Sequence, residues 1–162
     1  MSFCALCGQS HAGETRQLHL LLPEPIFRID EADRDGRAWV GSDSAVLRDR
    51  EQERFFVRAL LELPVADEHG HFGYSTWIEV DETAFDALRG SWLQMGSEPL
   101  TGALASEVHP YAFTEGLPVQ IHPRAADVLP LVELDDSDHE LVRAQRNGIS
   151  AHRAHELVAT VA

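Results

Sequence analysis

The sequence predicts an α+β fold, a mostly antiparallel sheet around a central hairpin at about residues 55–80, with one helix after it and two C-terminal helices packed on the sheet. Three observations favour this class. Two long segments with alternating side chains follow one another in mid-chain, shorter strand-like segments flank them, and the helical patterns gather toward the C-terminus. A doubly wound parallel sheet would instead require strands and helices to alternate strictly.

The central hairpin is predicted from FFVRALLELPV at residues 55–65 and FGYSTWIEV at residues 72–80. Successive side chains of a strand point to opposite faces, so the first segment has one fully apolar face and one mixed face. The aromatic and β-branched residues of the second segment are typical of strands, and the polar residues 67–71 supply the turn. On the mixed face, Phe56 and Leu60 need cover, either from a helix or from a second copy of the chain.

The remaining elements are predicted from periodicity and from turn residues. Strands are expected at residues 17–22, 45–48, 100–107, 117–121 and 128–134. Helices are expected as a short helix or loop within residues 24–43, a helix at 82–95, and two C-terminal helices at about 137–146 and 150–161. Ser137 and Glu140 fit the capping-box pattern, and Asn147-Gly148 is a favourable C-terminal cap.

Length and composition favour one domain, residues 1–162, with a compact N-terminal knuckle at about residues 3–11. The hydrophobic fraction of 44% is ordinary for a globular protein. No apolar run is long enough for a membrane helix, and no basic segment followed by an apolar one marks a secretory signal. Because Cys4 and Cys7 are too close in sequence for a disulfide scaffold, we expect a reducing, cytoplasmic location.

The net charge of −14 comes from 27 acidic and 13 basic residues. A field of that sign repels phosphate backbones, whereas nucleic-acid-binding proteins gain most of their affinity from Lys and Arg. The charge therefore argues against nucleic acid as a partner. Two interpretations remain open: the acidity keeps the protein soluble, or the acidic surface binds a basic partner protein.

The strongest chemical motif is Cys4-x2-Cys7-x3-His11, which predicts a zinc site. Two thiolates at this spacing reach one tetrahedral zinc from a tight turn, and Gly8 lets the backbone fold around the ion. The fourth ligand would be His19, or a His or Asp from elsewhere in the fold; three protein ligands plus water would resemble a catalytic zinc. A redox disulfide normally opens a helix after a strand, and metal-free thiols are the third alternative.

Other histidines give weaker signals. The turn at residues 69–71 contains two of them, His152 and His155 share a helix face, and His139 follows Asp138 in an arrangement that suits acid/base catalysis. In each case a solvated turn or an exposed helix end explains the pattern equally well. The sequence contains no nucleophile elbow, phosphate-cradling glycine loop or dinucleotide fingerprint.

Five stretches carry a family resemblance: CALCGQSH at 4–11, FFVRALLELPV at 55–65, FGYSTWIEV at 72–80, LTGALASEVHPY at 100–111, and DHELVRAQRNGIS at 138–150. Together they resemble a bacterial family of uncharacterised proteins, domain of unknown function 2199. The resemblance implies a single-domain bacterial cytoplasmic protein without an established activity. It also implies that the Cys/His knuckle recurs and that a further cysteine precedes the central strand, where this chain has Ser42-Asp43-Ser44-Ala45.

The sequence leaves two functions open. The first is a non-enzymatic, zinc-supported binding or interaction module whose acidic surface meets a basic partner. The second is a small metal-dependent hydrolase with an open zinc at Cys4, Cys7 and His11 and with His139 or Asp138 as acid/base. We favour the first, because the sequence shows no recognisable catalytic constellation. The oligomeric state is not predicted.

Overall fold

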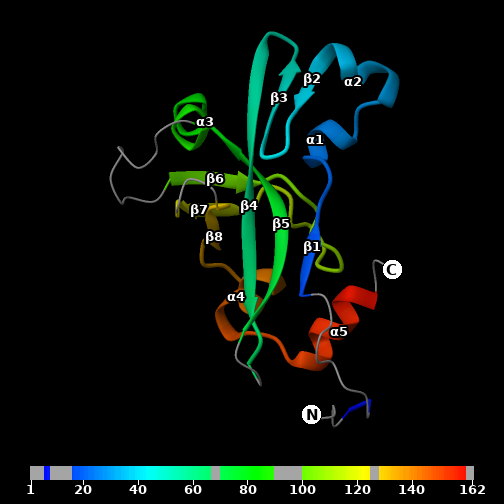
Figure 1. Ribbon diagram of the computed structural model, residues 1–162, viewed down its shortest axis with the longest axis vertical. Helices are drawn as coiled ribbons and strands as arrows, with labels where there is room; N and C mark the ends of the chain where they lie inside the picture. The colour runs from blue at the N-terminus through cyan, green and yellow to red at the C-terminus, as the bar shows by residue number, and fades with distance from the viewer. Residues whose placement is uncertain (1–5, 8–15, 67–69, 90–99, 125–127, 160–162) are drawn as a thin grey trace.

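The computed structural model describes residues 6–7, 16–66, 70–89, 100–124 and 128–159. The strands in this part of the chain are β1 (Gln17–His19), β2 (Ala38–Val40), β3 (Ser44–Asp49), β4 (Gln52–Pro64), β5 (His71–Val80), β6 (Leu100–Leu104), β7 (Pro118–His122) and β8 (Leu131–Leu134). The helices are α1 (Glu24–Phe27), α2 (Glu31–Arg37), α3 (Glu82–Arg89), α4 (Glu140–Asn147) and α5 (Ala151–Ala159), all shown in Figure 1.

The predicted central hairpin is confirmed. Strands β4 and β5 pair antiparallel from Phe55 opposite Val80 to Pro64 opposite His71, and they form the long axis of the molecule in Figure 1. The two faces of β4 also follow the predicted alternation, because Val57, Ala59, Leu61 and Leu63 are all buried in the main core.

The sheet closes on itself, which the sequence pattern did not predict. Strands β4, β5, β6, β7 and β8 pair antiparallel in chain order. Strand β8 then pairs parallel with β4, with Leu60 opposite Leu131 and Leu61 opposite Val132. The result is a closed five-stranded barrel with additional strands. The predicted α+β class and mostly antiparallel sheet are confirmed, and the closure into a barrel adds to them.

The barrel can close because β4 and β5 are each long enough to pair with two different strands along the same edge. Strand β3 pairs with the first half of β4, and β8 pairs with a later part of the same strand. Strand β1 pairs with the first half of β5, and β6 pairs with its second half. The outer pairings extend the sheet to the order β1-β5-β6-β7-β8-β4-β3-β2.

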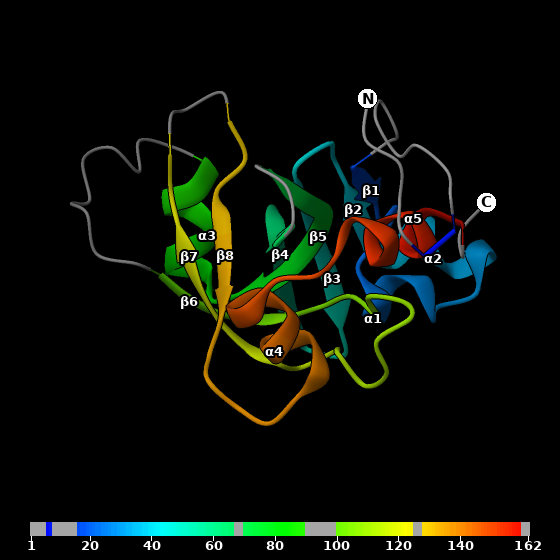
Figure 2. The ribbon, with the colours of Figure 1, turned by 90° about the horizontal axis from the view of Figure 1, so that it is seen from below.

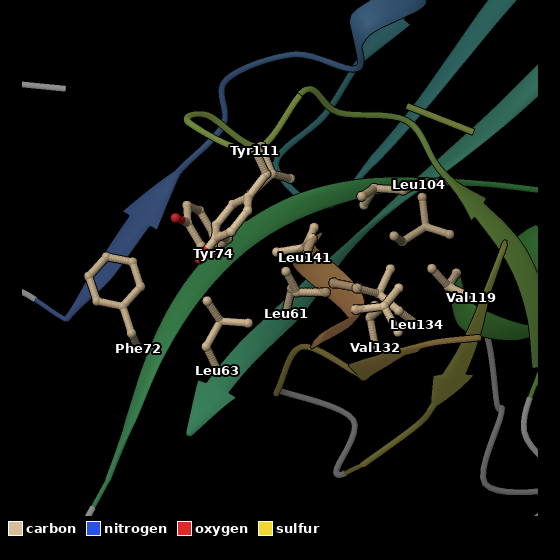
Figure 3. Close-up of a cluster of buried hydrophobic side chains, with 14 of the residues drawn as sticks. Leu61, Leu63, Phe72, Tyr74, Leu104, Tyr111, Val119, Val132, Leu134 and Leu141 are labelled. Carbon is tan, nitrogen blue, oxygen red and sulfur yellow. The ribbon is translucent and has the colours of Figure 1, made fainter. Parts of the chain in front are cut away.

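The main core fills the barrel and continues beneath the C-terminal helices, as Figure 3 shows for part of it. Tyr74 and Leu61 meet there with Leu104, Val132 and Leu141, all at most 4% exposed. The apolar faces of α4 and α5 join the same cluster, so the prediction that both C-terminal helices pack on the sheet is confirmed.

A smaller core lies on the other face of the hairpin. Phe56 and Trp77 are fully buried there against Ile26 of α1 and Ala45 of β3. The sequence left a helix or a second copy of the chain as the neighbour of the mixed face. For Phe56 the structure supplies a helix, α1. The region predicted as a short helix or loop contains both α1 and α2.

Several boundaries differ from the prediction. Strand β1 ends at His19, because the carbonyl of Leu20 accepts hydrogen bonds from the Arg58 and Trp77 side chains instead of a neighbouring strand. Strand β2 was not predicted. Helix α3 is described from Glu82, where it was predicted to begin, as far as Arg89, and the rest of the predicted 82–95 helix lies outside the described residues.

The predicted capping box at Ser137 is wrong. Helix α4 begins at Glu140, and His139 is its N-cap, since its Nδ1 accepts a hydrogen bond from the Leu141 N–H at 3.0 Å. The Ser137 hydroxyl accepts only from the His139 N–H. The predicted C-terminal cap is confirmed, because Gly148 follows α4 with a φ of +83°, a region that glycine enters at little cost.

Candidate functional site

The predicted zinc site lies mostly outside the described residues. Cys4 and His11 are outside the described residues, whereas Cys7 is described, lies in a turn and is exposed. Residues 6–7 lie near the beginning of α5 in both ribbon views (Figures 1 and 2). Among the described residues, no three His, Cys, Asp or Glu side chains gather closely enough to hold a metal ion. The zinc site therefore remains a prediction.

His139 has a structural role in this fold. Its Nδ1 caps α4, and its Nε2 lies 2.8 Å from the carbonyl oxygen of Ala112. With both ring nitrogens bound to backbone groups, His139 holds two distant segments together. This arrangement disfavours its use as the acid/base of a hydrolase, because a general acid or base needs a nitrogen free to exchange a proton with the substrate.

The remaining histidine candidates are dispersed. His71 lies 3.3 Å from Glu62 on the hairpin, and its predicted companion at position 69 is outside the described residues. His152 pairs with Glu156 at 3.0 Å, and its ring centroid lies 6.4 Å from that of His155. The shared helix face is thus confirmed, but ligand binding by these rings is not tested.

An unusual loop joins β6 to β7. We call residues 106–116 the Phe113 loop, because Phe113 stands at its tip with 87% of its side chain exposed. The backbone of Phe113 has a φ of +58°. Residues other than glycine rarely adopt this left-handed region, and a bulky side chain held there usually indicates a constraint imposed by the surrounding structure.

Buried hydrogen bonds hold the Phe113 loop in shape. The hydroxyl of Thr114, which is fully buried, accepts from the Val108 N–H and donates to the Ser106 carbonyl, both at 2.8 Å. The carboxylate of Glu107 accepts from the N–H groups of Thr114 and Glu115, each at 3.3 Å. The loop is therefore fixed from inside while its aromatic tip faces solvent.

Charged residues lie beside the Phe113 loop. The contact between Ala112 and His139 brings the exposed acidic segment 135–138 beside the loop, and Figure 2 shows the two segments side by side. Glu115 forms a two-pronged ion pair with Arg28, the residue that follows α1, with one of its two bonds at 2.7 Å. This hydrogen bonding lowers the pKa of Glu115 below its ordinary value. The Phe113 loop thus combines an exposed aromatic ring with an acidic border.

A pocket of about 530 Å³ opens where two strands leave the same edge of β4. The Arg58 N–H still bonds to the Asp43 carbonyl just before β3, and the Leu60 N–H bonds to the Pro130 carbonyl just before β8, both at 2.9 Å. Strands β3 and β8 diverge between these two bonds. We call the space that they leave the fork pocket. Among the described residues, its lining contains Asp43, Ser44, Val57, Arg58, Leu88, Arg89, Pro123, Arg124, Val128, Leu129 and Pro130.

Three arginines line the fork pocket without a carboxylate at ion-pairing distance among the described residues. Arg58 donates to the carbonyls of Ser42 and Leu20 and to the hydroxyl of Ser75, and its guanidinium lies 4.4 Å from the centre of the Trp77 ring. Burial lowers the pKa of Arg58, and the nearby charge of Asp43 acts in the opposite direction.

The other two guanidinium groups reach the pocket from different elements. Arg124, after β7, donates twice to the carbonyl of Leu129, at 2.8 and 2.6 Å. Arg89, at the end of α3, lies over the rings of Trp39 and Phe85, at 5.3 and 5.2 Å. Neutral acceptors and aromatic faces stabilise these cations without cancelling their charge.

The family comparison agrees with the sequence resemblance. The family described as "Uncharacterized protein conserved in bacteria (DUF2199)" matches residues 3–149. The chain therefore belongs to this bacterial family, whose description names no activity, and the resemblance is confirmed. No curated protein and no solved structure matches the chain. None of the helices in the described ranges is long and apolar enough to cross a membrane.

Sequence reasoning missed both the Phe113 loop and the fork pocket. A sequence signal existed for the loop, because Phe113 interrupts a polar stretch between two predicted strands. The fork pocket had none, since its arginines are far apart in sequence and meet only after the barrel closes. Asp43 and Ser44, within the segment where the resemblance implies a further cysteine, line this pocket.

Proposed function

We propose that this protein is a non-enzymatic interaction module that binds a basic, partly apolar segment of a partner protein through the Phe113 loop, with support from a zinc ion at the N-terminal knuckle. The observation that carries the proposal is the exposed Phe113, held at a positive φ by a loop whose own hydrogen bonds are buried. Backbone strain of this kind costs free energy and is found where a protein presents a side chain for function.

The aromatic ring supplies an anchor for the partner. Aromatic residues are enriched among the few side chains that dominate binding energy at protein interfaces. A ring fixed in place also loses little conformational freedom when it binds, since the loop is already ordered. Phe113 therefore suits an apolar side chain or pocket on the partner.

The charge around the ring selects a basic partner. The exposed carboxylates of Asp135, Asp136 and Asp138 lie on the segment that His139 attaches to the loop. The net charge of −14 has the same sign as this border, so long-range attraction and local contacts favour the same kind of partner. Complementary charge of this type mainly increases the association rate and the specificity.

Labelled peptides of known composition test the proposal. Fluorescence anisotropy would compare short peptides with alternating Arg and Leu, alternating Arg and Ser, and alternating Glu and Leu. We expect the Arg/Leu peptide to bind most tightly and the Phe113→Ser variant to bind it about tenfold more weakly or worse, the effect of losing an anchor at an interface. The double variant Asp136→Asn, Asp138→Asn should reduce both the affinity and its dependence on salt.

The matched control is Trp39→Ser, which removes a different aromatic ring, 50% exposed, on strand β2. Thermal unfolding verifies that each variant is folded. Equal binding by wild type and Phe113→Ser would contradict the proposal. Equal losses in Phe113→Ser and Trp39→Ser would contradict it too, because attraction would then be a general property of the acidic surface.

The zinc part of the proposal rests on the spacing of Cys4, Cys7 and His11. Because residues 6–7 lie near the beginning of α5 (Figures 1 and 2), we expect the fourth ligand to be His152 or His155. Elemental analysis of protein purified without a metal-affinity step should find about one zinc per chain, and none in the double variant Cys4→Ser, Cys7→Ser. Native protein without zinc would remove the metal from the proposal and leave the docking role of Phe113 to the peptide assay.

A further inference from the structure

We propose that the fork pocket binds a small organic oxyanion that carries two negative charges next to a compact apolar group. This site is separate from the Phe113 loop and does not depend on the proposed function. Three observations carry the inference: the uncompensated positive charge of the pocket, the pre-arranged guanidinium groups, and the apolar wall beside them.

The charge of the pocket is opposite to that of the protein. Its described lining contains three arginines and one aspartate, a formal charge of +2 for these residues, whereas the whole chain carries −14. Elsewhere in the described ranges, arginines such as Arg28, Arg54 and Arg146 are bound to carboxylates. Arg58, Arg89 and Arg124 have no such carboxylate there, although acidic side chains are twice as frequent as basic ones. A doubly charged anion would balance the lining.

The guanidinium groups are already oriented. The Nε and Nη1 of Arg58 are held by carbonyl and hydroxyl oxygens, and the Nε and Nη2 of Arg124 are held by the Leu129 carbonyl. Within the described part of the chain, the Nη2 of Arg58 and the Nη1 of Arg124 have no hydrogen-bond acceptor. An oxyanion would supply these acceptors, and guanidinium groups bind phosphate and carboxylate oxygens with charge-assisted, directional hydrogen bonds.

Partial burial strengthens the case for an anion. Removal of solvent from Arg58 lowers its pKa, so the cation is less stable in the empty pocket than in water. An anion next to the guanidinium would reverse this effect. The interaction is stronger here than on an open surface, because water screens it less.

The other wall of the pocket selects an apolar group. Leu88, Val128, Leu129 and two prolines line it. A volume of about 530 Å³ is within the range of pockets that bind small organic ligands, which combine apolar walls with a few fixed polar groups. An inorganic ion would fill only part of this space and would leave the apolar wall in contact with water.

Isothermal titration calorimetry on the full chain tests the inference with four probes. Phenyl phosphate and phthalate present the two doubly charged chemistries on an aromatic ring, inorganic phosphate lacks the ring, and benzyl alcohol lacks the charge. We expect at least one of the two aromatic dianions to bind, and to bind more tightly than inorganic phosphate and benzyl alcohol. The comparison of phenyl phosphate with phthalate identifies the preferred oxyanion.

The variants Arg89→Gln and Arg124→Gln should each weaken the better probe about tenfold or more, because a charge-assisted contact is lost. Arg143→Gln, on the exposed side of α4, makes the same charge change away from the pocket and should leave the affinity unchanged. Arg58 is not a useful variant, since its side chain also holds Leu20 and Ser75 in place. Failure of both aromatic dianions to bind would overturn the inference, as would equal losses in the Arg143 and Arg124 variants.

Discussion

The substitution Thr114→Val tests whether buried hydrogen bonds hold the Phe113 loop. Valine has nearly the same shape as threonine, so the change removes the hydroxyl and little else. The hydroxyl accepts from the Val108 N–H and donates to the Ser106 carbonyl, both at 2.8 Å. Thr114 and Val108 are fully buried, and Ser106 is 2% exposed, so water does not replace the lost partner.

The expected magnitude follows from these two contacts. A buried polar group that loses its hydrogen-bond partner costs about 1–3 kcal/mol. Two such groups, the Val108 N–H and the Ser106 carbonyl, predict a decrease of about 2–6 kcal/mol in the free energy of unfolding. The control Thr101→Val makes the same change at an exposed position of β6, where valine suits a strand, and should alter stability by less than about 0.5 kcal/mol.

Equilibrium unfolding in urea, followed by fluorescence and by circular dichroism, measures both variants. If Thr114→Val is no less stable than Thr101→Val, the loop is not held by this hydroxyl, and the argument that Phe113 is kept at a positive φ from inside fails.

Two further predictions concern packing and pH. A Cβ on Gly102 would lie 2.7 Å from the Glu79 carbonyl oxygen and 2.7 Å from a methyl group of Ile78. Gly102→Ala should therefore destabilise the protein by about 1–3 kcal/mol in urea unfolding. Gly36→Ala in α2 has no neighbour within 4 Å and should stabilise the protein by about 0.5–1 kcal/mol. Because Arg28 lowers the pKa of Glu115 in the folded state, the wild type should be more stable than Glu115→Gln by about 0.2–1 kcal/mol above pH 5. This difference should disappear as the pH falls below the ordinary glutamate pKa of about 4.3 and through the lowered pKa of Glu115. A difference that grows toward low pH would contradict the ion pair.

The central hairpin was predictable because its signal is local. Alternation from Phe55 to Leu63 depends only on the order of residues in one segment, and the structure places those side chains on the predicted faces. The capping box failed for the opposite reason. Ser137 and Glu140 have the right spacing, but the contact of His139 with Ala112 at 2.8 Å sets where the helix begins. A partner that far away in sequence leaves no mark on the local pattern.

Barrel closure was unpredictable on the same grounds. The pattern of β8 says which side chains face the core, but it does not say that Leu131 will lie opposite Leu60 in a parallel pair. That choice follows from five strands meeting in chain order around one core: since the number is odd, the first and the last strand run parallel when they meet. The fork pocket then results from closure, because β3 already occupies the first half of β4.

Net charge alone therefore predicts the sign of the local charge at only one of the two candidate sites. At physiological ionic strength the field of an exposed charge fades over about 8 Å, so the distant carboxylates of a protein with a net charge of −14 act weakly inside the fork pocket. There the nearest charges among the described residues are Arg58, Arg89 and Arg124 against Asp43, and our proposal assigns the choice of ligand to them. At the Phe113 loop, in contrast, the neighbouring acidic segment 135–138 and the overall field have the same sign. Composition predicts a partner only where the local charges agree with it, and the fork pocket is a place where they do not.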